Sequence, residues 1–171
     1  MHLVVRGDTD EILVERAMVD RAEAESVRDV RIACSFEVGD ERRYLKAVRR
    51  YPHAAVFVAE RSDGAMIGRL SLARDTHPAS THVADLGLMV AKDARRQGVG
   101  KALLEAAVEW ARGNGVRKLE LHVFPWNEPA IQLYERFGFE REGFRKGHYS
   151  RAGEDVDAIL MAYAVDLSTH G

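Results

Sequence analysis

The stretch Leu86-Gly-Leu-Met-Val-Ala-Lys-Asp-Ala-Arg-Arg-Gln-Gly-Val-Gly-Lys101 decides the fold, because an apolar strand pattern runs through a basic turn into a long helix pattern. Gly98 and Gly100 carry no side chain, so a ligand can approach the backbone closely. The first amides of a helix lack partners and lie at the positive end of its dipole, where phosphate groups bind. Four basic residues against the single acid Asp93 give the turn a charge of +3: Lys92, Arg95, Arg96 and Lys101. A phosphate site and an ordinary solvated basic loop are both compatible with these residues.

The segments on either side alternate between strand and helix patterns. We predict strands at Ile12–Ala17, Ala54–Glu60, Ala65–Ala73, Thr81–Val90, Val116–Phe124, Phe139–Tyr149 and Asp155–Val165. We predict helices that begin at Asp20 and that cover Asp40–Tyr51, Gly98–Gly113 and Glu128–Phe137. We expect a turn at Ser62-Asp63-Gly64, a loop at Arg74–Ser80, and an extra strand or an N-terminal extension over residues 1–10.

This order of elements predicts an α/β (α+β mixed) fold. The strand–helix–strand unit in the middle requires a parallel pair with a right-handed crossover, and the hairpins on either side are antiparallel. We therefore expect a mixed, mostly antiparallel sheet of about seven strands with helices on both faces. Two helices show an apolar side, which comprises Leu103, Ala107 and Trp110 in the first and Ala130, Leu133, Tyr134 and Phe137 in the second.

The composition predicts a single domain over residues 1–171 of a cytoplasmic protein. Hydrophobic residues are 46% and charged residues 30%, which is enough for a buried core. The net charge of -2 shows no basic excess, which disfavours a nucleic-acid partner. The single cysteine, Cys34, excludes an internal disulfide and a multi-cysteine metal site. We expect no metal site. We expect no signal peptide, because acids interrupt the N-terminal apolar residues, and no membrane-spanning segment, because no apolar run is long enough to cross a bilayer.

Two common phosphate-binding motifs are absent from the glycine turn. A P-loop requires G-x-x-x-x-G-K-(S/T), but Arg95 stands at the first glycine position and Ala102 follows Lys101. The dinucleotide fingerprint requires G-x-G-x-x-G, but Leu103 stands at the third glycine position. Kinase and dehydrogenase functions therefore lose their main support.

Arg95-Arg96-Gln97-Gly98-Val99-Gly100 matches the (Q/R)-x-x-G-x-(G/A) signature of the GNAT superfamily of N-acetyltransferases. The segment Asn127–Phe139 also resembles that family's N-x-x-A-x-x-L-Y-x-x-x-G-F pattern, and the strand before the turn ends in Leu88-Met89-Val90 as the family's strand does. The resemblance covers about Leu86–Phe139. It implies an enzyme that moves an acetyl group from acetyl-CoA to an amine by direct attack in a ternary complex.

The resemblance also implies which residues bind acetyl-CoA. The pyrophosphate is expected at the signature turn, mostly on backbone amides: Arg95, Arg96, Gln97, Gly98, Val99, Gly100 and Lys101. The pantetheine arm is expected to pair with the backbone of Leu88, Met89 and Val90. Asn127 is expected to contact the cofactor arm, to cap the following helix, or both.

Tyr134 occupies the family's general-acid position, from which a phenol protonates the departing CoA sulfur. Core packing is the alternative for this residue. The amine must be neutral to attack, so a group must accept its proton. His122 is one candidate base, because it lies on the strand face opposite Leu119 and Leu121 and at a position where related enzymes have a glutamate. Asp85 is the second candidate, and a water relay without a single base is the third.

The amine acceptor has several candidates. The tail from Phe139 resembles members that acetylate small primary amines, including amino acids, and a protein N-terminus is the second alternative. A polyamine would require an acidic site, which Glu37, Asp40 and Glu41 would supply. A non-catalytic acyl-CoA-binding module is the alternative from another class. Cys34 is expected to be a small buried residue rather than an acyl carrier, and the resemblance allows a homodimer.

Overall fold

The computed structural model of the protein describes residues 2–7, 14–18, 53–61, 65–151 and 153–167. Their contacts form two units, the first within Met1–Ala73 and Leu88–Ala107, and the second within Arg74–Gly87 and Val108–Gly171. The single-domain organisation stays a prediction. Several predicted features lie outside the described residues: the helices between Asp20 and Tyr51, the Ser62-Asp63-Gly64 turn, Cys34, Glu37, Asp40 and Glu41.

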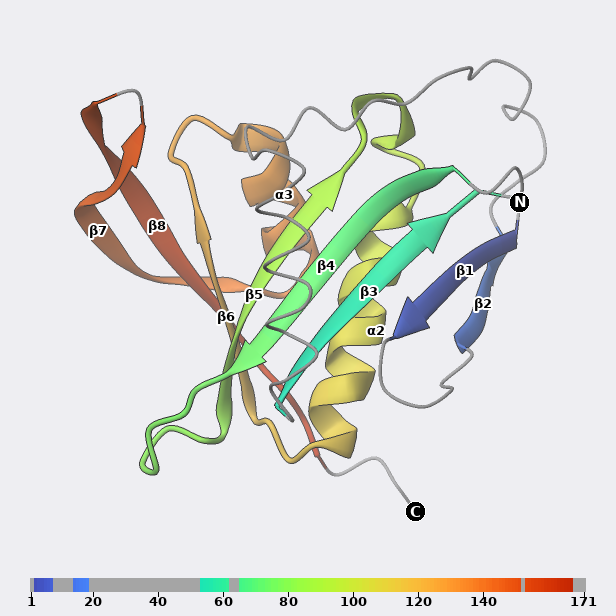
Figure 1. The fold of residues 1–171 in the computed structure, drawn as a ribbon. Coiled ribbons are helices and arrows are strands. Elements are labelled where there is room, and N and C mark those ends of the chain that lie inside the picture. The colour runs from blue at the N-terminus through green and yellow to red at the C-terminus, as the bar shows by residue number, and fades with distance from the viewer. Residues whose placement is uncertain (1, 8–13, 19–52, 62–64, 152, 168–171) are drawn as a thin grey trace. The chain divides into compact units, whose positions relative to one another are not determined.

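The first unit contains strands that pair antiparallel in the order β2-β1-β3-β4 (Figure 1). These strands are β1 (His2–Gly7), β2 (Val14–Met18), β3 (Ala54–Glu60) and β4 (Met66–Arg74), whose last residue belongs to the second unit. β1 confirms the extra strand near the N-terminus, and β3 has its predicted bounds. β4 begins one residue later than predicted, and the Arg61 amide donates to the carbonyl of Ala65, the residue before the strand, at 2.8 Å.

The second unit contains, in order, β5 (Val83–Val90, whose end lies in the first unit), β6 (Lys118–Val123), β8 (Glu154–Ala164) and β7 (Glu140–Arg151). β5 pairs in parallel with β6, and the other pairs are antiparallel. The predicted mixed, mostly antiparallel strand pairing is confirmed, with eight strands among the described residues. Helices on both faces stay a prediction, because the first two predicted helices lie outside those residues.

The predicted start of the third central strand, at Thr81, is wrong by two residues. The Val83 amide donates to the Ser80 carbonyl at 2.9 Å, and this bond keeps Thr81 and His82 in a turn. The Asp75 side chain stabilises the same turn, because it accepts hydrogen bonds from the Ser80 hydroxyl at 2.7 Å and from the His77 amide at 2.9 Å. The last three strands lie within two residues of their predicted ends.

The long helix α2 (Val99–Gly113) begins directly after the signature turn. Leu103 and Ala107 are fully buried, as predicted. Trp110 is only half-buried, which corrects the predicted apolar side, and Leu104 and Ala111 complete the buried side instead. Leu104 and Ala111 each lie one residue after a predicted position, which is about 100° around a 3.6-residue helix, so the centre of the buried stripe lies closer to Leu104 than the pattern indicated.

Gly68 of β4 allows the first turns of α2 to pack closely in the first unit. A Cβ atom at this position would lie 2.9 Å from Val99 Cγ1 and 3.0 Å from Leu103 Cδ1. Real Cβ atoms essentially never show the first distance, and the second is tighter than most, so the side chains of Val99 and Leu103 must shift to accept a substitution. The absence of a side chain at Gly68 therefore leaves room for the first turns of α2.

We predict that Gly68→Ala lowers the free energy of unfolding by about 1–3 kcal/mol, the usual effect of overpacking a core. Because the displaced residues begin α2, the variant is also expected to bind CoA more weakly. Denaturant unfolding and calorimetric CoA titration measure the two effects. Gly143→Ala is the matched control, since a Cβ there would meet nothing closer than 3.9 Å. Equal behaviour of the two variants would contradict the role of Gly68.

Candidate active site

The signature turn has the backbone of an anion site. A short 3-10 helix over Lys92–Ala94 precedes it, Arg96 has φ 60° and Gly98 has φ 83°. Left-handed residues alternating with others direct successive N–H groups toward one concavity, which binds anions. The following helix has no acidic residue in its first turn, so no side chain of its own competes for those amides. The left-handed conformation of Arg96, which is costly for a residue with a side chain, is typical of functional sites.

Side chains around the turn hold it in place and leave its positive charge dominant. The Gln97 side-chain amide donates to the Asp93 carbonyl at 2.7 Å, and Arg95 Nε donates to the Val90 carbonyl at 3.3 Å. The Asp93 carboxylate, the one acid of the turn, lies 3.5 Å from the guanidinium of Arg61. Arg61 therefore offsets the acid, and sequence spacing missed it because the two residues are 32 positions apart.

The remaining residues predicted to bind the cofactor divide into backbone and side-chain roles. The Val99 side chain is buried, so only its backbone is suited to a ligand. Lys101 is exposed and lies 3.7 Å from Glu105, one helical turn on. β5 pairs with β6 only over Val83–Asp85, and Leu88, Met89 and Val90 follow that ladder with half-buried side chains. The Ala91 amide donates to the Ile67 carbonyl at 2.9 Å, which fixes the end of this strand on β4.

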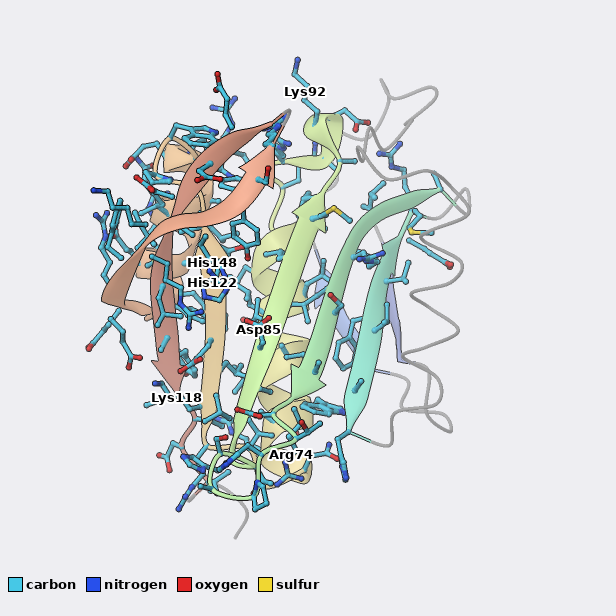
Figure 2. The ribbon with its side chains drawn as sticks, turned by 60° about the vertical axis from the view of Figure 1, so that its left-hand side comes forward. Arg74, Asp85, Lys92, Lys118, His122 and His148 are labelled. Carbon is cyan, nitrogen blue, oxygen red and sulfur yellow. The ribbon has the colours of Figure 1, made fainter. Side chains whose placement is uncertain are left out.

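Both candidate bases lie in the second unit, on neighbouring strands (Figure 2). Asp85 of β5 is in register with Glu120 of β6, and His122 follows two residues later on the same face. The residue Asp85 is exposed to solvent, but the surrounding protein partly desolvates its carboxyl group. This desolvation raises the pKa of Asp85 to about 6, with a further contribution from the charge of Glu120. Burial and the positive charge of Arg145 lower the pKa of His122, whose Nε2 is buried and has no hydrogen-bond partner among the described residues.

Two residues of β7 that the sequence did not single out as site residues join this pair. The His148 ring centroid lies 4.9 Å from that of His122, and the Tyr149 centroid lies 6.2 Å from it. Burial raises the pKa of Tyr149, and the negative charge of Asp85 raises it further. The structure therefore brings together two histidines, a tyrosine and a carboxyl group whose pKa is raised to about 6.

A bulge in β7 allows adjacent residues to face the same histidine. Arg145 pairs with Ala158 and Tyr149 with Val156, so four steps along β7 correspond to two along β8. Gly147 lies inside the bulge with φ 56°, and its amide donates to the Asp157 carboxylate at 2.7 Å. Consecutive side chains of a regular strand point to opposite faces, whereas a bulge re-aims them.

Tyr134 lies on α3 (Glu128–Phe137), also in the second unit. The Tyr134 ring is buried, and its centroid lies 5.6 Å from that of Phe139. Burial raises the pKa of the Tyr134 phenol to about 12. The predicted apolar face of this helix needs correction, because Ile131 is buried with Tyr134 whereas three of the predicted residues are half-buried: Ala130, Leu133 and Phe137. The helix ends at Gly138, as its left-handed φ of 112° requires.

Asn127 occupies the N-cap position of α3 but does not cap it through its side chain. Its carbonyl accepts the amides of Ala130 and Ile131, at 3.0 and 3.1 Å. The prediction that the Asn127 side chain caps the helix is therefore wrong, and the residue is exposed. Contact with the cofactor arm stays a prediction.

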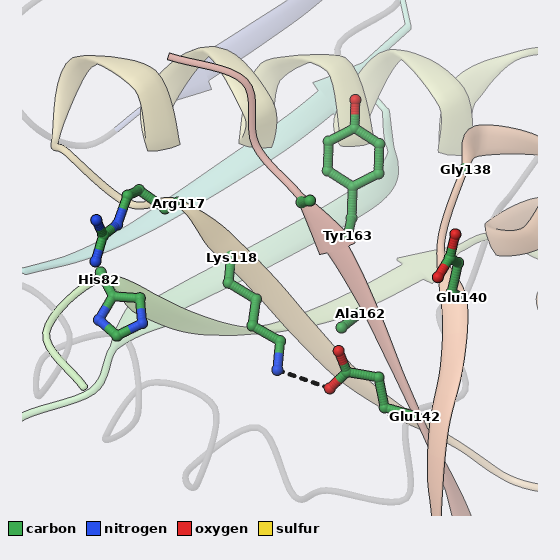
Figure 3. Close-up of a pocket in the computed structure, with 9 residues that line it drawn as sticks. His82, Arg117, Lys118, Gly138, Glu140, Glu142, Ala162 and Tyr163 are labelled. Carbon is green, nitrogen blue, oxygen red and sulfur yellow. Dashed lines mark hydrogen bonds and ion pairs between the residues drawn. The ribbon is translucent and has the colours of Figure 1, made fainter. Parts of the chain in front are cut away.

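A pocket of about 480 Å³ lies elsewhere in the second unit, beside the Lys118 end of β6 (Figure 3). Lys118 forms ion pairs with Glu142 at 2.7 Å and with Glu120 at 2.8 Å. Hydrogen bonds to these two carboxylates raise the pKa of Lys118. Lys118 and Glu142, which both line the pocket, are therefore paired with each other.

In the part of the chain that the structure describes, no three His, Cys, Asp or Glu side chains are grouped as ligands for a metal ion. None of the helices in that part combines the length and the apolar character that a membrane crossing requires.

Comparisons with known proteins give a family and several relatives. The family described as "Acetyltransferase (GNAT) family" matches residues 24–139. An L-amino acid N-acetyltransferase of Escherichia coli is 40% identical over 104 residues, and the match covers 58% of this chain but only 62% of that protein's length. The N-alpha-acetyltransferase RimI of Mycobacterium tuberculosis is 31% identical over 88% of this chain and 92% of its own length. The crystal structure of a ribosomal-protein-alanine N-acetyltransferase from Brucella melitensis matches with a TM-score of 0.67 and 28% identity, and the match covers 75% of this chain and 79% of that one.

Proposed function

We propose, from the premise that this chain belongs to the acetyltransferase (GNAT) family, that it transfers the acetyl group of acetyl-CoA to the primary amine of a small molecule, with an amino acid as the acceptor. The observation that carries the proposal is the signature turn, in which Arg96 and Gly98 adopt left-handed conformations directly before the unpaired amides of α2. This backbone suits a diphosphate, and the family uses acetyl-CoA as its acetyl donor.

In the proposed reaction the amine nitrogen forms a bond to the acetyl carbonyl carbon, and the bond between that carbon and the CoA sulfur breaks. The sulfur leaves with the electron pair, and the amine loses one proton to a base. Amide formation therefore needs one group that accepts a proton and one that stabilises the thiolate. We assign the second role to Tyr134, whose phenol keeps its proton because its pKa is about 12.

We assign the proton-accepting role to Asp85 ahead of His122. A general base works best when its pKa lies near the working pH, and the pKa of Asp85 is raised by burial to about 6. The pKa of His122 is lowered by burial and by the charge of Arg145, which makes this imidazole a weaker base than a free histidine. Above pH 6 the Asp85 carboxylate is ionised and able to accept the proton, so kcat/KM is expected to rise as pH increases through about 6.

We predict that Asp85→Asn removes this rise and lowers kcat/KM by about 100-fold or more at pH 7.5, the usual loss of a general base. Asparagine keeps the shape of the side chain but cannot accept the proton at this pH. His122→Gln is the matched comparison, and it is expected to retain the rise near pH 6. If His122→Gln loses the rise and Asp85→Asn keeps it, the two assignments are reversed.

The experiment that tests the proposed function measures thiol release from acetyl-CoA with separate panels of L-amino acids, polyamines and peptides with a free N-terminus. The expected result is amine-dependent release with amino acids, together with an acetylated product detected by mass spectrometry. Binding of CoA without release for any amine would instead identify a non-catalytic acyl-CoA-binding module and would contradict the proposal.

A protein N-terminus is the second candidate acceptor. The Mycobacterium tuberculosis relative, named as an N-alpha-acetyltransferase, aligns along most of both chains and favours this alternative. Faster release with peptides than with any free amino acid would select it.

A further inference from the structure

Three aromatic side chains form a continuous surface beside the candidate bases, and we call them the aromatic shelf: Phe124, Trp126 and Tyr149. The rings of Phe124 and Trp126 are stacked, with centroids 5.0 Å apart and an interplanar angle of 3°. Tyr149 meets Phe124 edge-on, with centroids 5.6 Å apart. Trp126 is 59% exposed and Tyr149 39% exposed, so large apolar faces remain in contact with water. Such faces favour binding of a flat or apolar group.

Opposite charges lie next to the shelf within the second unit. Asp85 and Glu120 contribute carboxylates from neighbouring strands in register. Arg145 contributes a guanidinium from β7. Its positive charge lowers the pKa of both Asp85 and Tyr149, whereas burial raises both. A ligand that carries an ammonium and a carboxylate on an apolar body complements this arrangement, because Arg binds carboxylates in a planar, two-point geometry.

The β7 bulge places the polar and apolar parts together. Tyr149 contacts both His122 and Phe124, so it connects the candidate bases to the shelf. The adjacent His148 contacts His122 as well, which a regular strand would not allow. The Gly147 amide bonded to the Asp157 carboxylate stabilises this conformation. The bulge therefore fixes the position from which Tyr149 joins the shelf to the candidate bases.

We propose that the acceptor is an α-amino acid with an aromatic or large apolar side chain. The shelf binds the side chain, Arg145 pairs with the α-carboxylate, and the α-amine lies toward the Asp85 and Glu120 carboxylates. This assignment rests on the proposed function and specifies its substrate class. Trp126 and Arg145 determine specificity, since neither is expected to take part in the transfer of the acetyl group.

The first test compares kcat/KM for L-phenylalanine and L-alanine in the intact chain and in Trp126→Ala. L-Phenylalanine is expected to be preferred by about 10-fold or more, the usual discrimination by apolar contacts, and Trp126→Ala is expected to remove most of that preference. Phe144→Ala is the matched control, because Phe144 is a 60% exposed aromatic of β7 and is not one of the shelf residues. No preference in the intact chain, or equal loss in both variants, would overturn the assignment of the shelf.

The second test separates the carboxylate from the side chain by comparing L-phenylalanine with phenethylamine, which lacks only the carboxylate. Arg145→Ala is expected to raise KM for L-phenylalanine by about 10- to 100-fold, the effect of losing a hydrogen bond to a charged group, without such a rise in KM for phenethylamine. Any change in kcat is expected to be alike for the two amines, because the charge of Arg145 also lowers the pKa of Asp85. Arg145→Lys is expected to restore part of the loss in KM, and Arg151→Ala is the control on the same strand. An equal rise in KM for both amines would overturn the role of Arg145.

The failure of this inference differs from the failure of the proposed function. If acetyl-CoA releases thiol with small amines but without preference for an apolar side chain or a carboxylate, the substrate class is wrong and the acetyltransferase function stands. If no amine is acetylated, the proposed function itself is wrong and this assignment falls with it.

Discussion

Replacement of Gly98 or Gly100 by glutamate is expected to weaken CoA binding by more than about 100-fold, because each change places a carboxylate beside the amides proposed to hold the diphosphate. The negative charge repels the ligand and occupies the same donors. At position 98 the left-handed φ of 83° adds strain, since residues with a side chain disfavour that conformation. Calorimetric titration with CoA measures the loss, and circular dichroism checks that each variant is folded.

Gly113→Glu is the matched control for both changes. Gly113 ends the same helix, and a Cβ atom there would meet nothing within 4 Å. It is not among the glycines with positive φ. A glutamate at this end of α2 lies far along the helix from the signature turn, so CoA affinity is expected to stay unchanged. Normal CoA affinity in folded Gly98→Glu and Gly100→Glu would remove the phosphate assignment.

Tyr134→Phe is expected to lower kcat by about 10- to 100-fold while CoA affinity stays the same, the size of effect expected from one hydrogen bond to a charged group. The pKa of Tyr134, raised by burial to about 12, lies well above the reference value of about 8.5 for a thiol. Complete proton transfer from this phenol to the thiolate is therefore uphill. We infer that Tyr134 stabilises the departing sulfur by donating a hydrogen bond rather than by giving up its proton.

Tyr163→Phe is the matched control, because both tyrosines pack against Phe139, at centroid distances of 5.6 Å for Tyr134 and 5.4 Å for Tyr163. The control tests whether removal of any hydroxyl from this aromatic group slows the reaction. Single-turnover measurements separate the chemical step from product release. A wild-type kcat for Tyr134→Phe would leave the residue with a packing role alone.

The sequence predicted most accurately the elements that have a local signal at their start and at their end. β3 and α3 have their predicted ends, since Pro52 precedes the first by two residues and Gly138 closes the second in a left-handed conformation. The alternation along β6 was also sufficient to place His122 on the face opposite Leu119 and Leu121, which are buried. In each case the deciding interactions are local, so the pattern alone contains the information.

The features that the sequence did not predict depend on contacts between distant residues. Arg61 approaches Asp93 through tertiary packing, and no local pattern indicates the pair. The bulge gives β7 two more residues than β8 between the same paired positions, so alternation along the strand cannot show that His148 and Tyr149 both face His122. Burial makes the larger contribution to the raised pKa of Asp85. A further contribution depends on the strand register that brings Glu120 beside it, and this register joins distant parts of the chain.

The most direct test of the central claim follows the backbone amides of the ¹⁵N-labelled chain while CoA is added. If the start of α2 holds the diphosphate, the amides of residues 96–101 shift most, and the same amides shift with a CoA fragment that retains only the nucleotide diphosphate. Large shifts elsewhere in the spectrum with none at residues 96–101 would contradict the phosphate site and the acetyl transfer that depends on it.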